Sequence, residues 1–282
     1  MTSTGKIPYI CRLKKTIQYL FLPLLMMTAF ACSKYQRVLK SSDVELKYEY
    51  ATKYYNEGDY AKAFPLYEEI GPLFRGSERS EEINYNYAYC NYHLKDFILA
   101  GYHFQRFYTV FPLSDKSEDA MFMSAYCFYL NSPVYSLDQS NTKEALGEFK
   151  KFNNTYPTSS LRDSSLVLMK EMNAKLERKA FENAELQFTL ENYKSAVVAF
   201  NNFLKDFPES STYKEKTSFL ILKSSFLLAI NSVQKKKEER INDTIDAYYN
   251  FVDNFANEKL IKESEEMYDQ ILKERDNLIT EK

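Results

Sequence analysis

The side chains most often used in catalysis are few in this sequence and poorly spaced. It has two histidines, His93 and His103, and no H-E-x-x-H pair that would bind zinc. It contains neither a C-x-x-C pair nor a glycine-rich phosphate loop. Acid pairs such as Glu68-Glu69 and Glu81-Glu82 are common on exposed helix faces and are no evidence of catalysis. The sequence therefore predicts a protein that is not an enzyme, with no cofactor and no metal site.

One cysteine stands where a covalent modification is expected. A basic segment ends at Lys15, and an apolar run over 17–31 follows it, so we interpret residues 1–31 as a signal peptide. Cys32 comes next, after the stretch Thr28-Ala29-Phe30-Ala31. Lipidation of Cys32 would hold the protein on a membrane while its body stays soluble. The alternative is ordinary cleavage at the same place, which would leave Cys32 as a free thiol.

The rest of the chain repeats one helical pattern. Its clearest copy has apolar residues at steps of 3, 4, 3 and 4, which places them on one face of a helix: Phe97, Ala100, Phe104, Phe107 and Phe111. Five copies occur, and their last aromatics are 37, 45, 51 and 48 residues apart. With only 6 glycines in 282 residues, turn-rich sheets are disfavoured. We predict an all-α fold, a right-handed α-solenoid of about five tetratricopeptide-like helical hairpins.

The expected boundaries follow these hairpins. Residues 32–42 form the lipidated cysteine and a polar tether, 43–257 the tetratricopeptide-repeat solenoid, and 258–282 a charged capping helix at the C-terminus. Within the solenoid, a helix over 60–74 is expected to complete the first hairpin.

Three further segments are less regular. The turn of the third hairpin is lengthened to 131–141. Residues 161–190 are expected to be helical, either throughout or with a break near 177–180. The charged run 235–240 is interpreted as a solvated loop or a frayed helix end.

A row of aromatic residues on the first helices is the candidate binding site. In stacked hairpins of this type the first helices line a groove, and eight aromatics are expected to project into it: Tyr48, Tyr55, Tyr85, Tyr89, Tyr92, Phe122, Tyr126 and Tyr129. Tyrosine offers a flat apolar face with a polar tip, which suits an extended peptide with aromatic side chains. The alternative is that many of these rings pack between helices.

Charge and cysteine placement exclude some other classes of protein. The whole chain has a net charge of −2. Its first 31 residues hold four cations and no acid, so the remaining residues carry a net charge of −6. A nucleic-acid binder would need a basic stripe, so nucleic acid is not an expected partner.

Cys90 and Cys127 occupy the same register of neighbouring repeats, roughly 10 Å apart, so they are expected to be buried thiols and not a disulfide.

Together these features resemble the BamD family, the tetratricopeptide lipoproteins of the β-barrel assembly machinery. The resemblance covers nearly all of the chain after the signal peptide. Its most specific part is the third turn, which ends in Asp138-Gln139 and leads into A-x-x-x-F-x-x-F-x-x-x-Y-P-x-S from Ala145 to Ser159. Ser33 after Cys32 is similar to a sorting signal for the outer membrane.

The resemblance implies an outer-membrane protein assembly factor that helps fold and insert β-barrel proteins. It would be lipid-anchored in the outer membrane and face the periplasm. Its implied partners are unfolded outer-membrane proteins, whose C-terminal strands would enter the aromatic groove, and a barrel subunit with periplasmic repeat domains docked on the C-terminal hairpins. Two alternatives stay open: a periplasmic tetratricopeptide scaffold for envelope or cell-wall machinery, and a carbohydrate-binding lipoprotein, because tyrosine rings also stack on sugars.

Overall fold

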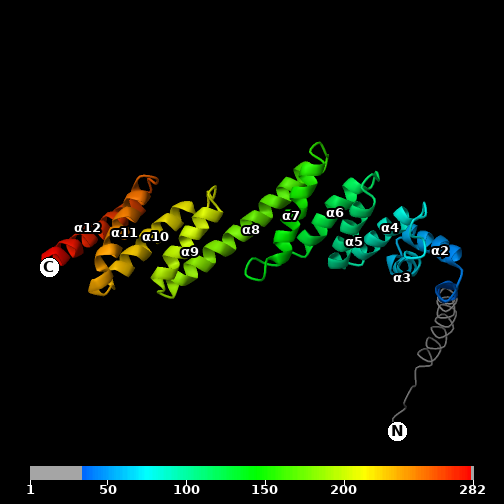
Figure 1. Ribbon diagram of the computed structural model, residues 1–282, viewed down its shortest axis with the longest axis horizontal. Helices are drawn as coiled ribbons and strands as arrows, with labels where there is room; N and C mark the ends of the chain where they lie inside the picture. The colour runs from blue at the N-terminus through cyan, green and yellow to red at the C-terminus, as the bar shows by residue number, and fades with distance from the viewer. Residues whose placement is uncertain (1–33, 281–282) are drawn as a thin grey trace, which may run out of the picture. The chain divides into compact units, whose positions relative to one another are not determined.

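A computed structural model describes residues 34–280 of the chain, and every labelled element in it is an α-helix (Figure 1). Within these residues there is no β-strand. The predicted signal peptide and Cys32 lie outside the described residues. The helices are α2 (Val44–Asn56), α3 (Tyr60–Ile70), α4 (Ser80–His93), α5 (Phe97–Val110), α6 (Ser117–Leu130), α7 (Ser140–Thr155), α8 (Arg162–Thr189), α9 (Tyr193–Asp206), α10 (Lys214–Ile230), α11 (Gln234–Val252) and α12 (Glu258–Thr280).

The chain forms two compact units. The first holds α2 to α7, arranged as three helical hairpins. The second holds the segment 133–139, most of α8, and α9 to α12. In each unit, successive helices pack against one another in sequence order. The fold prediction of an all-α repeat protein with about five hairpins is confirmed.

Short acidic residues define several helix starts. Asp43 accepts a 3.0 Å hydrogen bond from the Leu46 N–H and so caps α2. Gly58, at φ +76°, turns the chain into α3, which Asp59 caps in the same way. α3 ends at Ile70 and not near residue 74 as expected, because Pro72 lacks the N–H that would continue the helical hydrogen bonds, although Gly71 keeps helical backbone angles.

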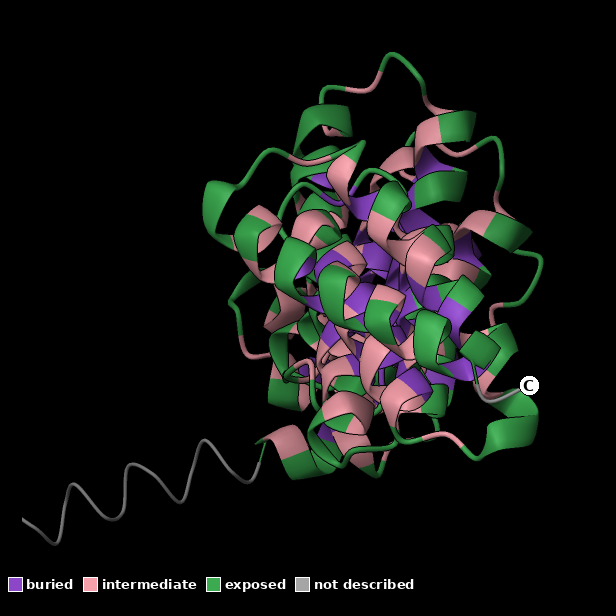
Figure 2. Ribbon diagram, turned by 90° about the vertical axis from the view of Figure 1, so that its left-hand side faces the viewer, coloured by how far each residue is buried: buried purple, intermediate pink, exposed green. Residues whose placement is uncertain are grey.

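The repeated apolar pattern forms the core of each hairpin. The aromatic side chains of the second helices are almost fully buried, among them Tyr67, Phe104, Phe107, Phe149, Phe152, Phe200, Phe203 and Phe251. Alanines of the first helices, such as Ala51, Ala88 and Ala125, have no exposed surface, because the partner helices approach them closely. Figure 2 shows the buried residues between the helices and the exposed ones on the outside.

The expected polar tether over 32–42 is wrong for residues 34–39. Residues 34–39 form a helix, and Val38 is only 3 % exposed because it packs into the core of the first hairpin. The ring of Tyr35 meets Tyr54 edge-on at 5.8 Å between centroids. An apolar and an aromatic residue thus bind this segment to α2, which its polar composition did not indicate.

Two other expectations are also decided by the structure. α8 is one continuous helix from Arg162 to Thr189, without a break. The run 235–240 is not a loop, because α11 begins at Gln234 and includes it. Contacts outside the run stabilise it: the Lys237 ammonium lies 2.5 Å from the Glu274 carboxylate of α12.

The lengthened third turn is ordered around one side chain. Gln139 is buried, and its amide nitrogen donates to the carbonyl oxygens of Val134 at 2.9 Å and Leu137 at 3.0 Å. The loop also contacts α8, where the Arg178 guanidinium lies 3.9 Å from the centroid of the Tyr135 ring. These contacts place the segment 133–139 in the second unit although α6 and α7, which it connects, belong to the first.

The structure also bears on the cysteines, on membrane spans and on metal sites. Cys90 and Cys127 are buried free thiols, as predicted. None of the helices within residues 34–280 has an apolar stretch long enough to cross a membrane. The same residues contain no group of three or more histidine, cysteine or acidic side chains placed to hold a metal ion.

Candidate functional site

The eight predicted aromatics lie on the first helices of the three hairpins of the first unit. We call them the aromatic strip: Tyr48 and Tyr55 on α2, Tyr85, Tyr89 and Tyr92 on α4, and Phe122, Tyr126 and Tyr129 on α6. Spacings of three, four and seven residues place the members of each helix on one face. All eight are half-buried. Each ring therefore packs against the protein on one side and reaches solvent on the other.

Ring contacts connect the strip from α4 to α6. On α6, Tyr126 stacks on Phe122 and on Tyr129, with centroids 6.1 and 5.8 Å apart. The Tyr92 ring of α4 lies 6.5 Å from Tyr126, and Tyr89 lies 6.2 Å from Tyr92. Because each ring is held by its neighbours, a ligand that stacks on the strip would meet surfaces already in place, which lowers the entropic cost of binding.

Phenol–carboxylate bonds fix several of these rings. Tyr48 donates to Glu82 at 2.8 Å, while Tyr85 and Tyr89 donate to the same oxygen of Asp119 at 2.7 and 2.5 Å. Burial, and then the hydrogen bond to Asp119, raises the pKa of Tyr85 and Tyr89, so both phenols stay protonated donors. Their hydroxyls already donate hydrogen bonds to Asp119, so only their ring surfaces are available to a ligand.

Other hydroxyls of the strip are available. The phenols of Tyr92 and Tyr126 make no hydrogen bond with any residue of 34–280. They can serve a ligand as donors or acceptors beside the ring faces. A shallow cavity of about 510 Å³ adjoins the strip at α2, where Tyr48, Thr52 and Arg79 line it. The Arg79 guanidinium lies 4.5 Å from the Tyr48 ring centroid and also pairs with Glu45.

The acid partners of the tyrosines were missed from the sequence. Glu82 was interpreted as part of an exposed acid pair and Asp119 was not singled out, although each lies 34 residues after its tyrosine. The signal was present in the repeat, because Tyr48 and Tyr85 are 37 residues apart and so are Glu82 and Asp119. The structure brings the eight predicted residues onto neighbouring helices. Their role in binding a ligand stays a prediction.

Sequence comparison identifies the family. The profile described as "YfiO: Outer membrane lipoprotein" matches residues 40–257. The chain belongs to the YfiO family of outer membrane lipoproteins. Membership confirms the coarser part of the resemblance, an outer-membrane lipoprotein built of tetratricopeptide-like repeats. No curated protein matches this YfiO-family chain.

Two solved structures are similar to this YfiO-family protein. The tetratricopeptide domain of P58(IPK) is 14 % identical, with a TM-score of 0.39, and the match covers 85 % of this chain and 68 % of that one. A putative kinesin light chain from Podosopora anserina, with nearly identical tetratricopeptide-like repeats, is 10 % identical, with a TM-score of 0.31. That match covers 73 % of this chain and 95 % of the other.

Proposed function

We propose that this YfiO-family protein is an outer-membrane protein assembly factor. It helps fold and insert β-barrel proteins by binding their C-terminal segments on the aromatic strip. The observation that carries the proposal is a connected row of half-buried, pre-positioned rings in a lipoprotein of this family. A terminal aromatic side chain stacks on these rings, and the free phenols of Tyr92 and Tyr126 bond to the peptide backbone.

The remaining parts of the chain have their own proposed roles. Residues 1–31 are the signal peptide, and Cys32 carries the lipid that holds the protein in the outer membrane, facing the periplasm. Residues 43–257 are the repeat body, and its C-terminal hairpins bind the periplasmic repeat domains of a barrel subunit. Residues 258–282 form the cap. In support of this last role, α12 buries Met267, Ile271 and Leu278 against α10 and α11, while its other side is charged and exposed.

A peptide titration tests the strip. The probe is a fluorescent ten-residue peptide with alternating apolar and polar residues that ends in phenylalanine, and the matched probe ends in serine. We expect the phenylalanine probe to bind at least tenfold more tightly, and a Tyr92→Ala/Tyr126→Ala variant to lose that difference. Tyr102→Ala is the control, because Tyr102 is 57 % exposed on α5 and lies outside the strip. Unchanged binding by a folded double variant would overturn the assignment.

Two further measurements separate this function from its rivals. Crosslinked purification from outer membranes should recover a barrel protein with periplasmic repeat domains. Recovery of cell-wall enzymes in its place, or tighter binding of glycans than of the phenylalanine probe, would contradict the proposal. A Cys32→Ser variant should leave the membrane fraction, and its retention there would contradict lipidation.

A further inference from the structure

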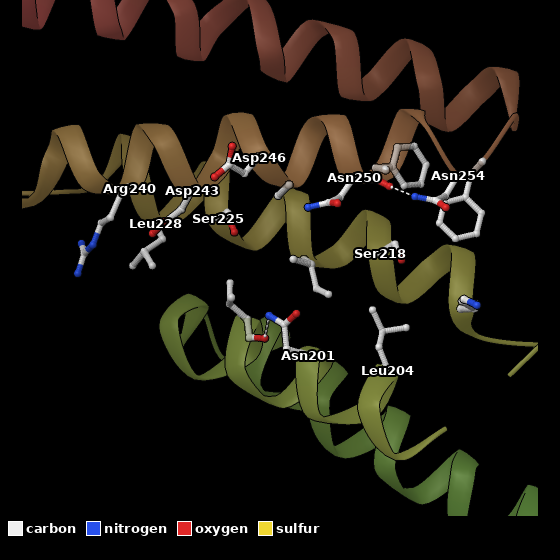
Figure 3. A pocket seen from close by; sticks show the side chains of 16 residues that line it. Asn201, Leu204, Ser218, Ser225, Leu228, Arg240, Asp243, Asp246, Asn250 and Asn254 are labelled. Atoms are coloured by element: carbon white, nitrogen blue, oxygen red, sulfur yellow. Dashed lines mark hydrogen bonds between the residues drawn. The ribbon is translucent and has the colours of Figure 1, made fainter. Parts of the chain in front are cut away.

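A second candidate site lies in the other unit. A cavity of about 590 Å³ opens between α9, α10 and α11 (Figure 3). All its lining residues belong to the second unit, whereas the aromatic strip belongs to the first. Along one wall, α11 presents a polar row at steps of 3, 3, 4 and 4: Arg240, Asp243, Asp246, Asn250 and Asn254. Its volume is within the range of about 300–1,000 Å³ that is common for ligand sites.

Two of the three side-chain amides that line the cavity already donate hydrogen bonds within the chain. The Asn201 amide nitrogen donates to the Val197 carbonyl at 2.8 Å, and the Asn254 amide nitrogen donates to the Asn250 carbonyl at 2.8 Å (Figure 3). The carbonyl oxygens of both amide groups are left to accept. The two cations of the lining also have partners within the chain, because Arg240 donates to the Ser232 hydroxyl and Lys214 to the Pro208 carbonyl.

The two acids of the cavity have no such partners. Asp243 and Asp246 make neither a hydrogen bond nor an ion pair with any residue in the described part of the chain. They lie one helical turn apart on α11, so their charges repel each other. Burial, together with the charges of Glu239 and Asp246, raises the pKa of Asp243, and Arg240 offsets this only in part. A cation placed between the two carboxylates would relieve the repulsion.

A mostly buried serine also lines the cavity, and its hydroxyl has no partner within the described residues. Ser225 is 6 % exposed, and its side chain makes no hydrogen bond with any residue of 34–280. Its neighbour Ser224 has no exposed surface and donates back to the Leu220 carbonyl at 2.6 Å. The Ser225 hydroxyl keeps some solvent-accessible surface and lines the cavity, so it can donate to or accept from a ligand atom there.

The same cavity has an apolar side. Leu204 of α9 and Ile221 and Leu228 of α10 line the cavity with apolar surface. Long cationic side chains have an aliphatic stem that packs well on such a surface while the charged end reaches polar groups. The two carboxylates without partners, beside this apolar surface, therefore fit a lysine or arginine side chain better than a small inorganic cation.

We propose that this cavity binds a lysine or arginine side chain within an extended segment of a partner protein. The charged end lies between Asp243 and Asp246, and its stem packs on Ile221 and Leu228. Charge complementarity selects this occupant, because the cavity holds two carboxylates without an ion pair, whereas its two cations already donate to oxygen atoms of the chain. The inference does not depend on the aromatic strip or on the proposed function.

The test is a titration of the full-length lipoprotein in detergent with a fluorescent heptapeptide. The peptide is capped at both ends and has one central arginine between leucines and serines, and the matched probe has uncharged citrulline at the same place. We expect the citrulline probe to bind at least tenfold more weakly. A D243N/D246N variant should lose at least tenfold in affinity for the arginine probe, and Ser225→Ala should lose about threefold.

Matched variants keep the outcome unambiguous. Asp269→Asn removes an exposed acid of α12 that is outside the cavity and should bind as the parent protein does. Tyr126→Ala should also bind normally, so a failure of the strip proposal and a failure of this one are distinguishable. Equal affinity for the two probes, or an unchanged affinity in a folded D243N/D246N variant, would overturn the inference. Equally tight binding of free arginine amide would overturn the partner-segment assignment.

Discussion

The phenol of Tyr85 donates a 2.7 Å hydrogen bond to the carboxylate of Asp119, in the first turn of the next hairpin. One repeat earlier, Tyr48 makes the equivalent bond to Glu82, in the first turn of α4, at 2.8 Å. Each bond joins the first helix of one hairpin to the first helix of the next. The aromatic strip is therefore positioned by polar contacts between hairpins as well as by packing of its rings.

Asp119→Ala should destabilise the first unit. The substitution leaves the half-buried phenols of Tyr85 and Tyr89 without their acceptor, which we expect to lower the free energy of unfolding by about 1–3 kcal/mol. Asp115→Ala is the control, because Asp115 is exposed and makes no hydrogen bond with any residue of 34–280, so its effect should stay within about 0.5 kcal/mol. Urea denaturation measures both values. Equal effects would show that the tyrosine–Asp119 bonds contribute nothing specific.

Replacing two glycines by alanine should change the free energy of unfolding in opposite directions. Gly147 lies inside α7, and an added Cβ would meet no atom within 4 Å, so Gly147→Ala should raise the free energy of unfolding by about 0.5–1 kcal/mol. Gly58 has φ +76° at the turn between α2 and α3, so Gly58→Ala should lower it by about 1–2 kcal/mol. Thermal denaturation of the two variants checks the pair. A stabilising Gly58→Ala would contradict the left-handed turn.

The repeat periodicity made the helices and their buried faces predictable. Phe104 and Phe107 are spaced three residues apart within a pattern that only a helix places on one face, and both are buried as expected. The same local pattern could not settle whether α8 is broken. Nor could it show that Val38 packs into the first core, because that contact joins segments that no short-range pattern relates.

Polar contacts between repeats were the hardest part to predict. Charged side chains are mostly exposed, so the sequence alone does not indicate that Lys47 of α2 is buried. In the structure Lys47 is 3 % exposed, and its ammonium pairs with Glu69 of α3. The acids that hold the aromatic strip were missed for the same reason. The pattern of the sequence does not distinguish Glu82 and Asp119 from exposed acids, because their tyrosine partners belong to the preceding hairpin.

Gln139→Ala should open the lengthened third turn. Its amide nitrogen donates to the carbonyls of Val134, Tyr135 and Leu137, so its loss leaves the loop without its central donor. We expect chymotrypsin to cleave after Tyr135 and Leu137 several-fold faster than in the parent protein. Ser136→Ala is the matched control, because Ser136 is exposed and makes no hydrogen bond with any described residue. Equal cleavage rates in the two variants would show that Gln139 does not order the loop.

His103 should make the first unit less stable as the pH falls. Burial lowers the pKa of His103 from its ordinary value of 6.5; Arg106 lowers it further and Asp96 offsets part of this shift. Below pH 6.5 the unfolded chain takes up a proton at this position while the folded chain does not, so the free energy of unfolding falls. The loss stops growing once the pH passes the folded-state pKa.

A variant comparison isolates this contribution from that of the carboxylates. His103→Gln removes the titrating group, so the variant should lose less stability than the parent protein between pH 7.5 and pH 5. The measurement is urea denaturation at both values. His93→Gln is the control: partial burial also lowers the pKa of His93, but His93 is more exposed than His103, so the substitution should change the pH dependence less. A parent protein and a His103→Gln variant with the same loss of stability would show that His103 is protonated in the folded chain as readily as in the unfolded one.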